Sequence, residues 1–321
     1  MRGGDPRAGA HVLADIGKTS FRLRYTLDGV PAATVVEPAA AVLTGPASAD
    51  ELLEQLRQML RALPAGAAGA CGVVVGVAGY LAHSAALPDL PARVRALFSR
   101  ARIVLTSDLA LAHAGALGGG AGAVLVAGTG AVALGVASTG ATRVADGLGP
   151  GAGDRGGGAW IGREALIDAL QAGAYGSRFV EMAGALLGLE RNGLSALVDA
   201  APREARRLAQ LAPLMLDALD AGDEAAAGIV DRAIEHLTTT LAEAAAALTG
   251  AERCAAVVGG LSAHALFRAR LSARVAAIAE IEVVAAEGDA LAGAGILARC
   301  DAVPALPALM TLATVDAAPE R

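Results

Sequence analysis

Four short segments of this 321-residue sequence combine residue types that bind phosphates or move protons. They are Asp15-Ile16-Gly17-Lys18-Thr19-Ser20, Asp108, Gly128-Thr129-Gly130 and Gly259-Gly260. Backbone N–H groups and hydroxyls in such turns can hold phosphate oxygens, and carboxylates can bind a cation or accept a proton. Each segment alone is weak evidence, because a Gly-Thr-Gly in a hairpin is more often a simple turn. Two such turns that each open one half of a duplicated architecture could face each other across a cleft and grip phosphates from both sides.

Lys18 is the only lysine in the sequence, which has 26 Lys and Arg residues together and therefore 25 arginines. The Ala-, Gly- and Arg-rich composition indicates a genomic base bias that replaces lysine by arginine wherever either residue serves. Arginine ends in a wide planar fork and lysine in a compact ammonium, so the replacement should fail in a tight turn beside a polyphosphate. The alternative is a solvated lysine kept by chance. We interpret Lys18 as a phosphate ligand.

Two carboxylates are candidates for contact with a substrate. Asp108 follows an apolar strand in Thr106-Ser107-Asp108-Leu109, where it could face a cleft and accept a hydroxyl proton as general base. The alternative is a helix N-cap, because an apolar helical run follows. Asp154 lies in a glycine-rich loop and is interpreted as a ligand for substrate hydroxyls, against the alternative of a turn-forming aspartate. Ser107 is assigned to the substrate together with Asp108.

Composition limits the class of protein. A chain of this length exceeds the size at which one core stops growing, so two lobes are expected, and 55% hydrophobic residues supply both cores. A net charge of −6 and 2% aromatic residues argue against a nucleic-acid partner. Cys71, Cys254 and Cys300 have no paired spacing and predict reduced thiols. Because the first residues lack an apolar signal segment, we expect a cytoplasmic protein.

The stretch 109–142 contains no charged residue and would attract a hydropathy search for membrane spans. Gly118-Gly119-Gly120 and Gly128-Thr129-Gly130 cut it into pieces too short to cross a bilayer. We therefore expect buried strands there and no membrane partner. The five histidines show no metal-ligand spacing and receive no role.

The first third of the chain predicts a mixed sheet covered by helices. Alternation of apolar residues and turn signals predicts strands at residues 12–15, 20–25, 33–36, 72–78 and 103–106. The turns between the first three lie at residues 16–19 and at Asp28-Gly29. Amphipathic helices are expected at residues 49–62 and near residues 91–100.

The pattern restarts with strands expected at residues 123–127 and 131–136, around Gly128-Thr129-Gly130. Residues 158–249 are expected to be almost wholly helical, with loops near Asn192-Gly193 and Gly222. A strand at 255–258, a helix from Ser262, a strand at 281–285 and a helix at 289–299 complete the fold, and the tail after Pro304 is weakly specified. The expected lobes are residues 1–107 with 289–321, and residues 108–288.

The order of these motifs resembles that of the actin-like ATPase and sugar-kinase superfamily, whose phosphate 1, connect, phosphate 2 and adenosine motifs follow one another along the chain. The resemblance covers most of the sequence. Gly147-Leu148-Gly149 and the segment 153–162 are similar to N-acetylglucosamine kinases and BadF/BadG-type ATPases. Arg155 stands where those relatives often have Glu, and Lys18 stands where their first loop usually has a second Gly. Both departures resemble the actinobacterial glucosamine kinases.

The resemblance implies an α/β fold of the two-lobed actin-like ATPase (ribonuclease H-like) type, with duplicated mixed sheets and a cleft between the lobes. It implies that Asp15 holds Mg²⁺, generally through water, and that Gly17-Lys18-Thr19-Ser20 contacts the β and γ phosphates of ATP. Gly128-Thr129-Gly130 would hold the phosphates from the opposite lobe. Gly259-Gly260 would let the backbone approach adenine and ribose, where a Cβ would intrude.

The activity implied is ATP-dependent phosphorylation of an amino sugar, from glucosamine to glucosamine 6-phosphate. An N-acetylglucosamine kinase would share every motif. A BadF/BadG-type activator ATPase would need cysteines that bridge a dimer around an iron–sulfur cluster, and these cysteines offer no obvious pair. A non-catalytic sugar sensor would normally add a helix-turn-helix, for which there are too few residues before His11. The identity of the sugar and the oligomeric state, a homodimer included, stay open.

Overall fold

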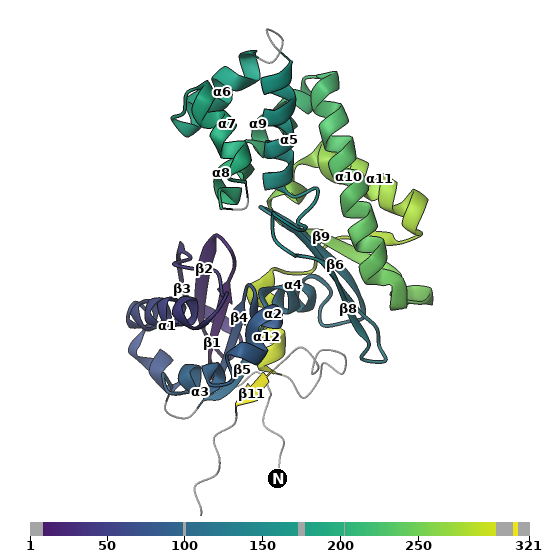
Figure 1. The fold of residues 1–321 in the computed structure, drawn as a ribbon. Helices are drawn as coiled ribbons and strands as arrows, with labels where there is room; N and C mark the ends of the chain where they lie inside the picture. Colours follow the sequence, from purple (N-terminus) through teal and green to yellow (C-terminus); the bar gives the residue numbers. More distant parts are fainter. Residues whose placement is uncertain (1–8, 99–100, 173–176, 202, 300–310, 314–321) are drawn as a thin grey trace, which may run out of the picture. The chain divides into compact units, whose positions relative to one another are not determined.

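The computed structural model describes residues 9–98, 101–172, 177–201, 203–299 and 311–313, which belong to two compact units. Unit 1 comprises Met1–Ala121, Ala137–Ala141 and Ala286–Arg321, and unit 2 comprises Gly122–Val136 and Thr142–Ala285. Each unit contains one mixed sheet with helices packed against it (Figure 1). The division falls after Ala121 rather than after residue 107, because the helix that begins at Asp108 packs within unit 1.

The sheet of unit 1 has the strand order β11-β5-β4-β1-β2-β3. Its strands are β1 (Ala10–Ile16), β2 (Ser20–Leu27), β3 (Val30–Pro38), β4 (Gly72–Val77), β5 (Arg102–Thr106) and β11 (Thr311–Ala313). The first three form the expected antiparallel meander, whereas β4 lies parallel to both β1 and β5. Strand β11 pairs antiparallel with β5 and comes from the tail after Pro304, for which no strand was predicted.

Helices cover both faces of this sheet. The helices α1 (Pro46–Arg61) and α3 (Leu90–Arg95) bury apolar side chains against one set of residues of β1, which includes Val12 and Ile16. Because side chains alternate along a strand, the other set, which includes Asp15, points to the opposite face. That face is covered by α4 (Asp108–Ala116) and α12 (Ala290–Ala298). A short helix α2 (Tyr80–His83) follows β4.

Two glycines allow α4 and α12 to approach closely. A side chain at Gly115 would overlap the backbone of Asp289, and one at Gly293 would overlap the carbonyl of Leu111. The backbone contact explains why residues far apart in sequence share this face. It also brings Asp289, the residue that precedes α12, against α4.

The sheet of unit 2 has the strand order β10-β9-β6-β7-β8. Its strands are β6 (Gly122–Ala127), β7 (Ala131–Val136), β8 (Thr142–Asp146), β9 (Cys254–Val258) and β10 (Glu282–Val284). The expected hairpin of β6 and β7 is confirmed, and β9 lies parallel to β6. The sequence did not predict β8, because this short strand is largely exposed and lacks a buried apolar run.

The helices of unit 2 form two groups. One group packs into its own hydrophobic cluster and consists of α5 (Gly158–Gln171), α6 (Ser177–Leu187), α7 (Arg191–Asp199), α8 (Ala205–Ala209) and α9 (Ala212–Asp220). In the other, α10 (Glu224–Ala244) packs on β6, β7 and β8, and α11 (Ala265–Ala279) packs on α10. The helix-to-helix loop expected near Asn192-Gly193 lies just before them, at residues 188–190 between α6 and α7, and the two residues themselves belong to the first turn of α7. The loop at Gly222 is confirmed.

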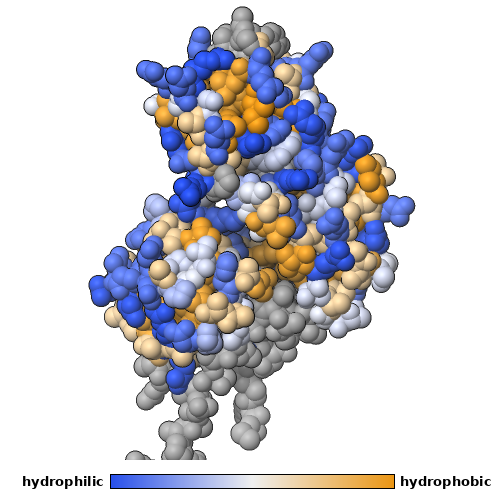
Figure 2. Space-filling model, in the orientation of Figure 1, coloured by the Kyte–Doolittle hydropathy of each residue, from blue (hydrophilic) through white to orange (hydrophobic). Residues whose placement is uncertain are grey.

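The surface mixes hydrophilic and hydrophobic side chains (Figure 2). Exposed large hydrophobic residues include Val30 and Val36 on β3 and Leu186 on α6. No helix in the described ranges is long and apolar enough to cross a membrane. Among the described residues, Cys71 and Cys254 form no disulfide, and Cys300 lies outside these residues.

Candidate functional site

The parallel strands of unit 1 bring two of the predicted segments to one edge of the sheet. Strands β1 and β5 both lie parallel to β4, so their C-terminal ends meet at the same edge. Asp15 pairs with Gly76 of β4, and Gly76 pairs with Thr106 at the end of β5. Ligand sites of α/β sheets form outside the carboxyl ends of the strands. Asp15, Lys18 and Asp108 therefore belong to one candidate site.

Asp15 is held by Arg22, which lies directly opposite it on β2. The Arg22 guanidinium donates from Nε and Nη2 to Asp15 Oδ2, at 2.9 and 2.6 Å, and from Nη1 to Asp289 Oδ2, at 2.9 Å. Asp15 is only 6% exposed. Burial raises its pKa, the charge and hydrogen bonds of Arg22 oppose this rise, and the charge of Asp289 adds to it. The result is a buried carboxylate with a fixed orientation.

Asp289 connects this network to α12. Its Oδ1 accepts a hydrogen bond of 2.9 Å from the backbone N–H of Ala292, so it is the N-cap of the helix. The other carboxylate oxygen, Oδ2, accepts the hydrogen bond from Arg22 Nη1. One residue thus ties the start of α12 to the pair formed by β1 and β2.

Asp108 is not the N-cap of α4. That position is taken by Ser107, whose buried hydroxyl accepts a 3.0 Å hydrogen bond from the backbone N–H of Ala110. Asp108 is the first residue of the helix, and its Oδ1 accepts from the N–H of Leu109 at 2.9 Å. Ser107 therefore has the N-cap role that was the alternative for Asp108. The contact of Ser107 with a substrate stays a prediction.

The pKa of Asp108 is raised to about 7. Burial is the largest cause, followed by the negative charge of Asp15, while the N–H of Leu109 and the charge of Lys18 act in the opposite direction. At neutral pH both protonation states are populated, which is the property expected of a group that accepts and releases a proton. The influence of Asp15 and Lys18 on this pKa also indicates that the three side chains lie within electrostatic range.

The turn between β1 and β2 is short and closed by a backbone hydrogen bond of 2.9 Å, from Gly17 N–H to the carbonyl of Ser20. Gly17 has no left-handed φ, and a Cβ there would make an ordinary contact of 3.6 Å with that carbonyl. Lys18 is half-buried and Thr19 is exposed at the tip. The turn can thus present a lysine ammonium and hydroxyls at the edge that also carries Asp108.

The donor set of this edge suits a magnesium ion that arrives with a phosphate. In the part of the chain that the structure describes, no three His, Cys, Asp or Glu side chains are grouped to hold a metal by themselves. Mg²⁺ is usually bound through one or two carboxylates with substrate phosphates and waters. The carboxylate of Asp15, with that of Asp108 within electrostatic range, fits this pattern.

In unit 2, the turn Gly128-Thr129-Gly130 is built into the start of α5. The N–H of Gly158 donates to the carbonyl of Gly128 at 2.7 Å, and that of Ala159 donates to the carbonyl of Thr129 at 2.9 Å. These are first-turn N–H groups that a helix leaves without an internal partner. They fix the backbone of the turn, which is closed by a 3.0 Å bond from Gly128 N–H to the carbonyl of Gly130.

Asp154 lies directly beside this turn. Its side chain is buried, and a Cβ at Gly130 would overlap its carboxylate. Its φ of 57° falls in the left-handed region, which is uncommon for a residue other than glycine and marks candidate functional positions. The structure therefore brings together Asp154 and the second turn, which the sequence had connected only by resemblance.

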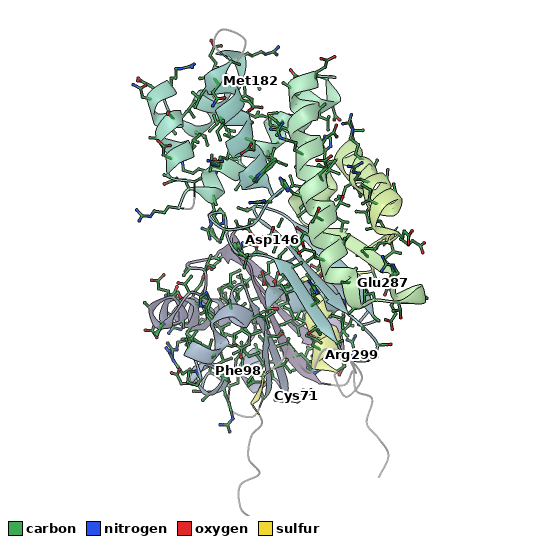
Figure 3. All side chains as sticks on the ribbon, turned by 45° about the vertical axis from the view of Figure 1, so that its right-hand side comes forward. Cys71, Phe98, Asp146, Met182, Glu287 and Arg299 are labelled. Atoms are coloured by element: carbon green, nitrogen blue, oxygen red, sulfur yellow. The ribbon has the colours of Figure 1, made fainter. Side chains whose placement is uncertain are left out.

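Asp146 fixes the loop that carries Asp154. Its two carboxylate oxygens accept from the backbone N–H groups of Asp154 at 2.6 Å and Arg155 at 3.2 Å. Asp146, which is labelled in Figure 3, is the last residue of β8, and it also has a left-handed φ, of 59°. Sequence reasoning missed this residue, and the only local signal was its place in the turn before Gly147.

Gly259 and Gly260 follow β9, which is the parallel neighbour of β6. Gly259 has a φ of 101°, and a Cβ there would overlap the backbone of Ala127 at the end of β6. The packing of β9 beside β6 therefore requires a glycine at position 259. Gly260, in contrast, has open space around the position of a Cβ. Because β9 and β6 are parallel, both residues lie at the same edge of the sheet as Gly128, which follows β6.

The predicted residues therefore form two groups. Unit 1 contains Asp15, Asp108 and the turn 17–20, and unit 2 contains the turn 128–130, Asp154 and the pair 259–260. Arg22 and Asp289 were missed. A hairpin register centred on the turn would have placed Arg22 opposite Asp15, whereas the contact of Asp289 depends on the packing of α12.

The single tryptophan, Trp160, lies near the start of α5. It is half-buried and contacts the ring of His236 edge to face, with centroids 5.1 Å apart and an interplanar angle of 77°. This contact gives Trp160 a packing role between α5 and α10.

No protein-family model matches this chain, and no curated protein gives a significant match. Among solved structures, it is similar to a proposed N-acetylglucosamine kinase from Chromobacterium violaceum, with a TM-score of 0.69, 27% identity, and coverage of 91% of this chain and 99% of that one. It is also similar to a proposed N-acetylglucosamine kinase from Porphyromonas gingivalis, with a TM-score of 0.70, 19% identity and coverage of 89% and 98%.

A third solved structure, a proposed N-acetylmannosamine kinase from Listeria monocytogenes, has a TM-score of 0.57, 13% identity and coverage of 91% and 99%. These similarities extend over nearly the whole of each chain. The predicted fold class, an α/β architecture of duplicated mixed sheets of the actin-like ATPase type, is confirmed.

Proposed function

We propose that this chain transfers the γ-phosphoryl group of ATP to a hydroxyl of an amino sugar, and that the sugar is glucosamine, which becomes glucosamine 6-phosphate. The observation that carries the proposal is the carboxyl of Asp108, which follows β5 within electrostatic range of Asp15 and Lys18 and has a pKa of about 7. A sugar hydroxyl must lose its proton as it attacks phosphorus, and a carboxylate with this pKa suits the transfer.

Asp108 would act as the general base. The proton passes from the sugar hydroxyl to a carboxylate oxygen of Asp108 while the hydroxyl oxygen bonds to the γ-phosphorus. The bond from that phosphorus to the leaving oxygen of ADP breaks in the same transfer. Burial and the charge of Asp15 make the Asp108 carboxylate more basic, whereas Lys18 keeps part of it ionised at neutral pH.

The first turn, and a Mg²⁺ ion held by Asp15, would compensate the negative charge of the phosphates. Lys18, with the hydroxyls of Thr19 and Ser20, would contact the β and γ phosphates. Asp15 would hold Mg²⁺, which when bound neutralises charge that develops on the transferred group. Arg22 orients the Asp15 carboxylate by donating twice to a single oxygen, and so leaves the other oxygen of that carboxylate for this role.

We assign the residues of unit 2 to the remaining parts of the substrates. Gly128-Thr129-Gly130 would bind phosphates through its backbone, and Asp154 would accept hydrogen bonds from sugar hydroxyls. Gly259-Gly260 would face the adenosine. The open space at Gly260 and at Gly128, where a Cβ would meet no protein atom, supports a close approach of ligand to backbone at these two positions.

The choice of glucosamine depends on Lys18 and Arg155, the two positions at which the sequence resembles the actinobacterial glucosamine kinases. N-acetylglucosamine is the second candidate, because two similar solved structures are proposed N-acetylglucosamine kinases. The two sugars differ only in the substituent at carbon 2, so the same base and phosphate ligands would serve both.

A comparison of sugars tests the proposal. Purified protein is incubated with ATP and Mg²⁺ and with glucosamine, N-acetylglucosamine, N-acetylmannosamine or glucose, and kcat/KM is measured for each. Phosphorus NMR of the product identifies the phosphorylated hydroxyl. We expect the highest kcat/KM with glucosamine and phosphate on the 6-hydroxyl. A higher kcat/KM with N-acetylglucosamine would show that the substrate is N-acetylglucosamine instead of glucosamine. If no sugar is phosphorylated, the proposed kinase activity is wrong.

A further inference from the structure

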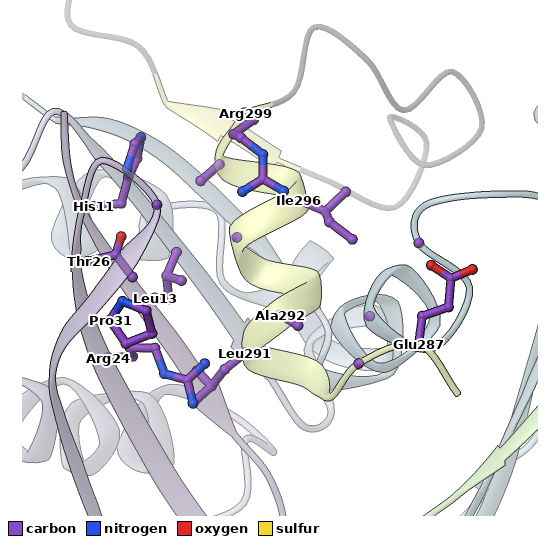
Figure 4. Close-up of a pocket in the computed structure, with 16 residues that line it drawn as sticks. His11, Leu13, Arg24, Thr26, Pro31, Glu287, Leu291, Ala292, Ile296 and Arg299 are labelled. Atoms are coloured by element: carbon purple, nitrogen blue, oxygen red, sulfur yellow. The ribbon is translucent and has the colours of Figure 1, made fainter. Parts of the chain in front are cut away.

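A cavity lies in unit 1, on the same sheet face as Asp15 but toward the N-terminal end of β1. Its volume is about 340 Å³, near the lower limit of the roughly 300–1,000 Å³ that is usual for small-molecule sites. Its walls include His11 of β1, Arg24 and Thr26 of β2, and one side of α12 up to Arg299 (Figure 4). None of the residues predicted for the candidate site lines it.

The walls carry an excess of positive charge. Arg24 and Arg299 are both half-buried, and within the described ranges neither forms an ion pair with a carboxylate. Arg24 donates only a long hydrogen bond, of 3.3 Å, to the hydroxyl of Thr34. Glu287 is the single carboxylate among the lining residues, and it precedes α12 whereas Arg299 follows it. Partly desolvated guanidinium groups are costly unless an anion pairs with them.

Neutral donors line the same cavity as the two arginines. His11 and Thr26 are paired in register across β1 and β2, and both are buried. Burial, and secondarily the charge of Arg299, lower the pKa of His11, so its ring is neutral at physiological pH. A neutral ring donates one N–H, and the threonine hydroxyl donates one O–H. The cavity thus offers two guanidinium forks and two neutral donors, with no carboxylate among the residues of the strand side.

We propose that this cavity binds a small phosphate-bearing molecule, with the phosphate group held between Arg24 and Arg299. The planar fork of arginine matches the oxygens of a phosphate and favours it over a single point anion. The cavity's strands and helix also carry Asp15, Arg22 and Asp289, so a bound phosphate contacts the elements that build the candidate site. The binding itself requires neither ATP nor a sugar.

Calorimetric titration with inorganic phosphate, and separately with glucosamine 6-phosphate and succinate, tests this site. The chain is compared with the double variant Arg24→Gln/Arg299→Gln, with Lys18→Ala, and with Arg57→Gln, which removes an exposed arginine of α1 that pairs with Glu54. We expect phosphate affinity to fall about tenfold or more in the double variant and to persist in the other two. Because glucosamine 6-phosphate is also the product proposed for the candidate site, only the part of its binding that the double variant loses is assigned to this cavity. If that part is as tight as, or tighter than, phosphate binding, the ligand is a sugar phosphate, and if it is weaker, the ligand is phosphate itself.

Unchanged phosphate binding in the double variant, its loss in Lys18→Ala alone, or tighter binding of succinate would each overturn the proposal. Circular dichroism establishes that the variants are folded. If the double variant does not fold, Arg24→Lys and Arg299→Lys replace it, since each keeps the charge but loses the fork, and phosphate binding should weaken in both. Because the readout is binding, a chain without kinase activity can still pass this test, and an active kinase can fail it.

Discussion

The carboxyl of Asp108 titrates near pH 7 because burial and the charge of Asp15 outweigh the favourable contacts of its ionised form with the Leu109 N–H and Lys18. Ser107 supplies the helix cap, so the Asp108 side chain is not required to start α4. Its raised pKa therefore represents a cost in stability at neutral pH that the cap of α4 does not require. We interpret that cost as the signature of a reacting group.

Replacing Asp108 by Asn should remove the base and keep the site. We expect kcat to fall by about 10²–10⁴, the usual contribution of a general base, with little change in ATP affinity. Steady-state kinetics and calorimetric ATP binding measure the two quantities. Asp223→Asn is the matched control, because Asp223 caps α10 through a 2.9 Å bond from the Ala226 N–H and lies outside both residue groups. Near-normal turnover in Asp108→Asn would contradict the assigned role.

The same variant should be more stable than the wild-type protein at high pH. The folded pKa of Asp108 is about 7 against an ordinary 3.8, so the folded state binds more protons between these values and wild-type stability falls as pH rises through this window. Above it the loss is complete, with an upper limit of about 4 kcal/mol. Asparagine cannot ionise, so the difference in unfolding free energy should grow in favour of Asp108→Asn from pH 5 to pH 8. Urea unfolding at both pH values measures it, and a constant difference would contradict the raised pKa.

Lys18 should matter through both its charge and its shape. The charge lowers the pKa of Asp108, so Lys18→Ala should move the rising limb of kcat/KM against pH to higher pH, whereas Lys18→Arg should leave the limb in place. The wider fork of arginine should still raise KM for ATP in the tight turn. Complete pH profiles of both variants separate the two effects. If both variants behave like the wild type, Lys18 is a surface lysine retained by chance.

At the scale of elements, the glycines in the turns that follow the strands differ in whether the surrounding protein leaves room for a side chain. Gly130 and Gly259 are required by the protein, because a Cβ would overlap the carboxylate of Asp154 in one case and the backbone of Ala127 in the other. Gly128 and Gly260 have open space around them. A sequence cannot separate these cases, because all four residues stand in similar Gly-containing turns after strands.

Because only Gly259 lacks space for a side chain, alanine should have different effects at the neighbouring positions Gly259 and Gly260. Gly259→Ala should lower thermal stability, because its φ of 101° and the contact with Ala127 both exclude a side chain. Gly260→Ala should leave stability unchanged and weaken ATP binding, because the new methyl group points into space that we assign to adenosine. Thermal melts and calorimetric ATP titration of the two variants test the assignment. Unchanged ATP affinity in Gly260→Ala would remove Gly260 from the nucleotide site.

Contacts between elements also mark the limit of what the sequence could predict about the site. Asp15, Lys18 and Asp108 could be proposed because each lies at or just after the end of an apolar strand, and parallel strands end at a common edge. Asp289 and Asp146 could not, because their partners are set by how α12 and the loop after β8 fold back. The pKa of Asp108 was equally inaccessible, since it depends on burial and on the charges of Asp15 and Lys18, which lie far from Asp108 in sequence.

At the scale of the whole molecule, the duplicated α/β plan was predictable from the restart of the strand pattern at residue 123. The division of the chain after Ala121 was not predictable. It depends on the packing of α4 against α12, and α12 comes from the other end of the chain. The helices between β8 and β9 were expected as a class. Their boundaries were predicted less closely: Asn192-Gly193, a typical loop dipeptide, belongs to the first turn of α7, and the loop itself lies at residues 188–190.

The most direct test of an ATP-dependent sugar kinase is the release of ADP with and without sugar, measured in one coupled assay at saturating Mg²⁺ and ATP. We predict slow release by the wild-type protein alone and rapid release once glucosamine is added. Asp108→Asn should lose the sugar-dependent part and Asp223→Asn should keep it. Equal ADP release with and without every sugar tested, and equal release by Asp108→Asn, would contradict the proposed activity.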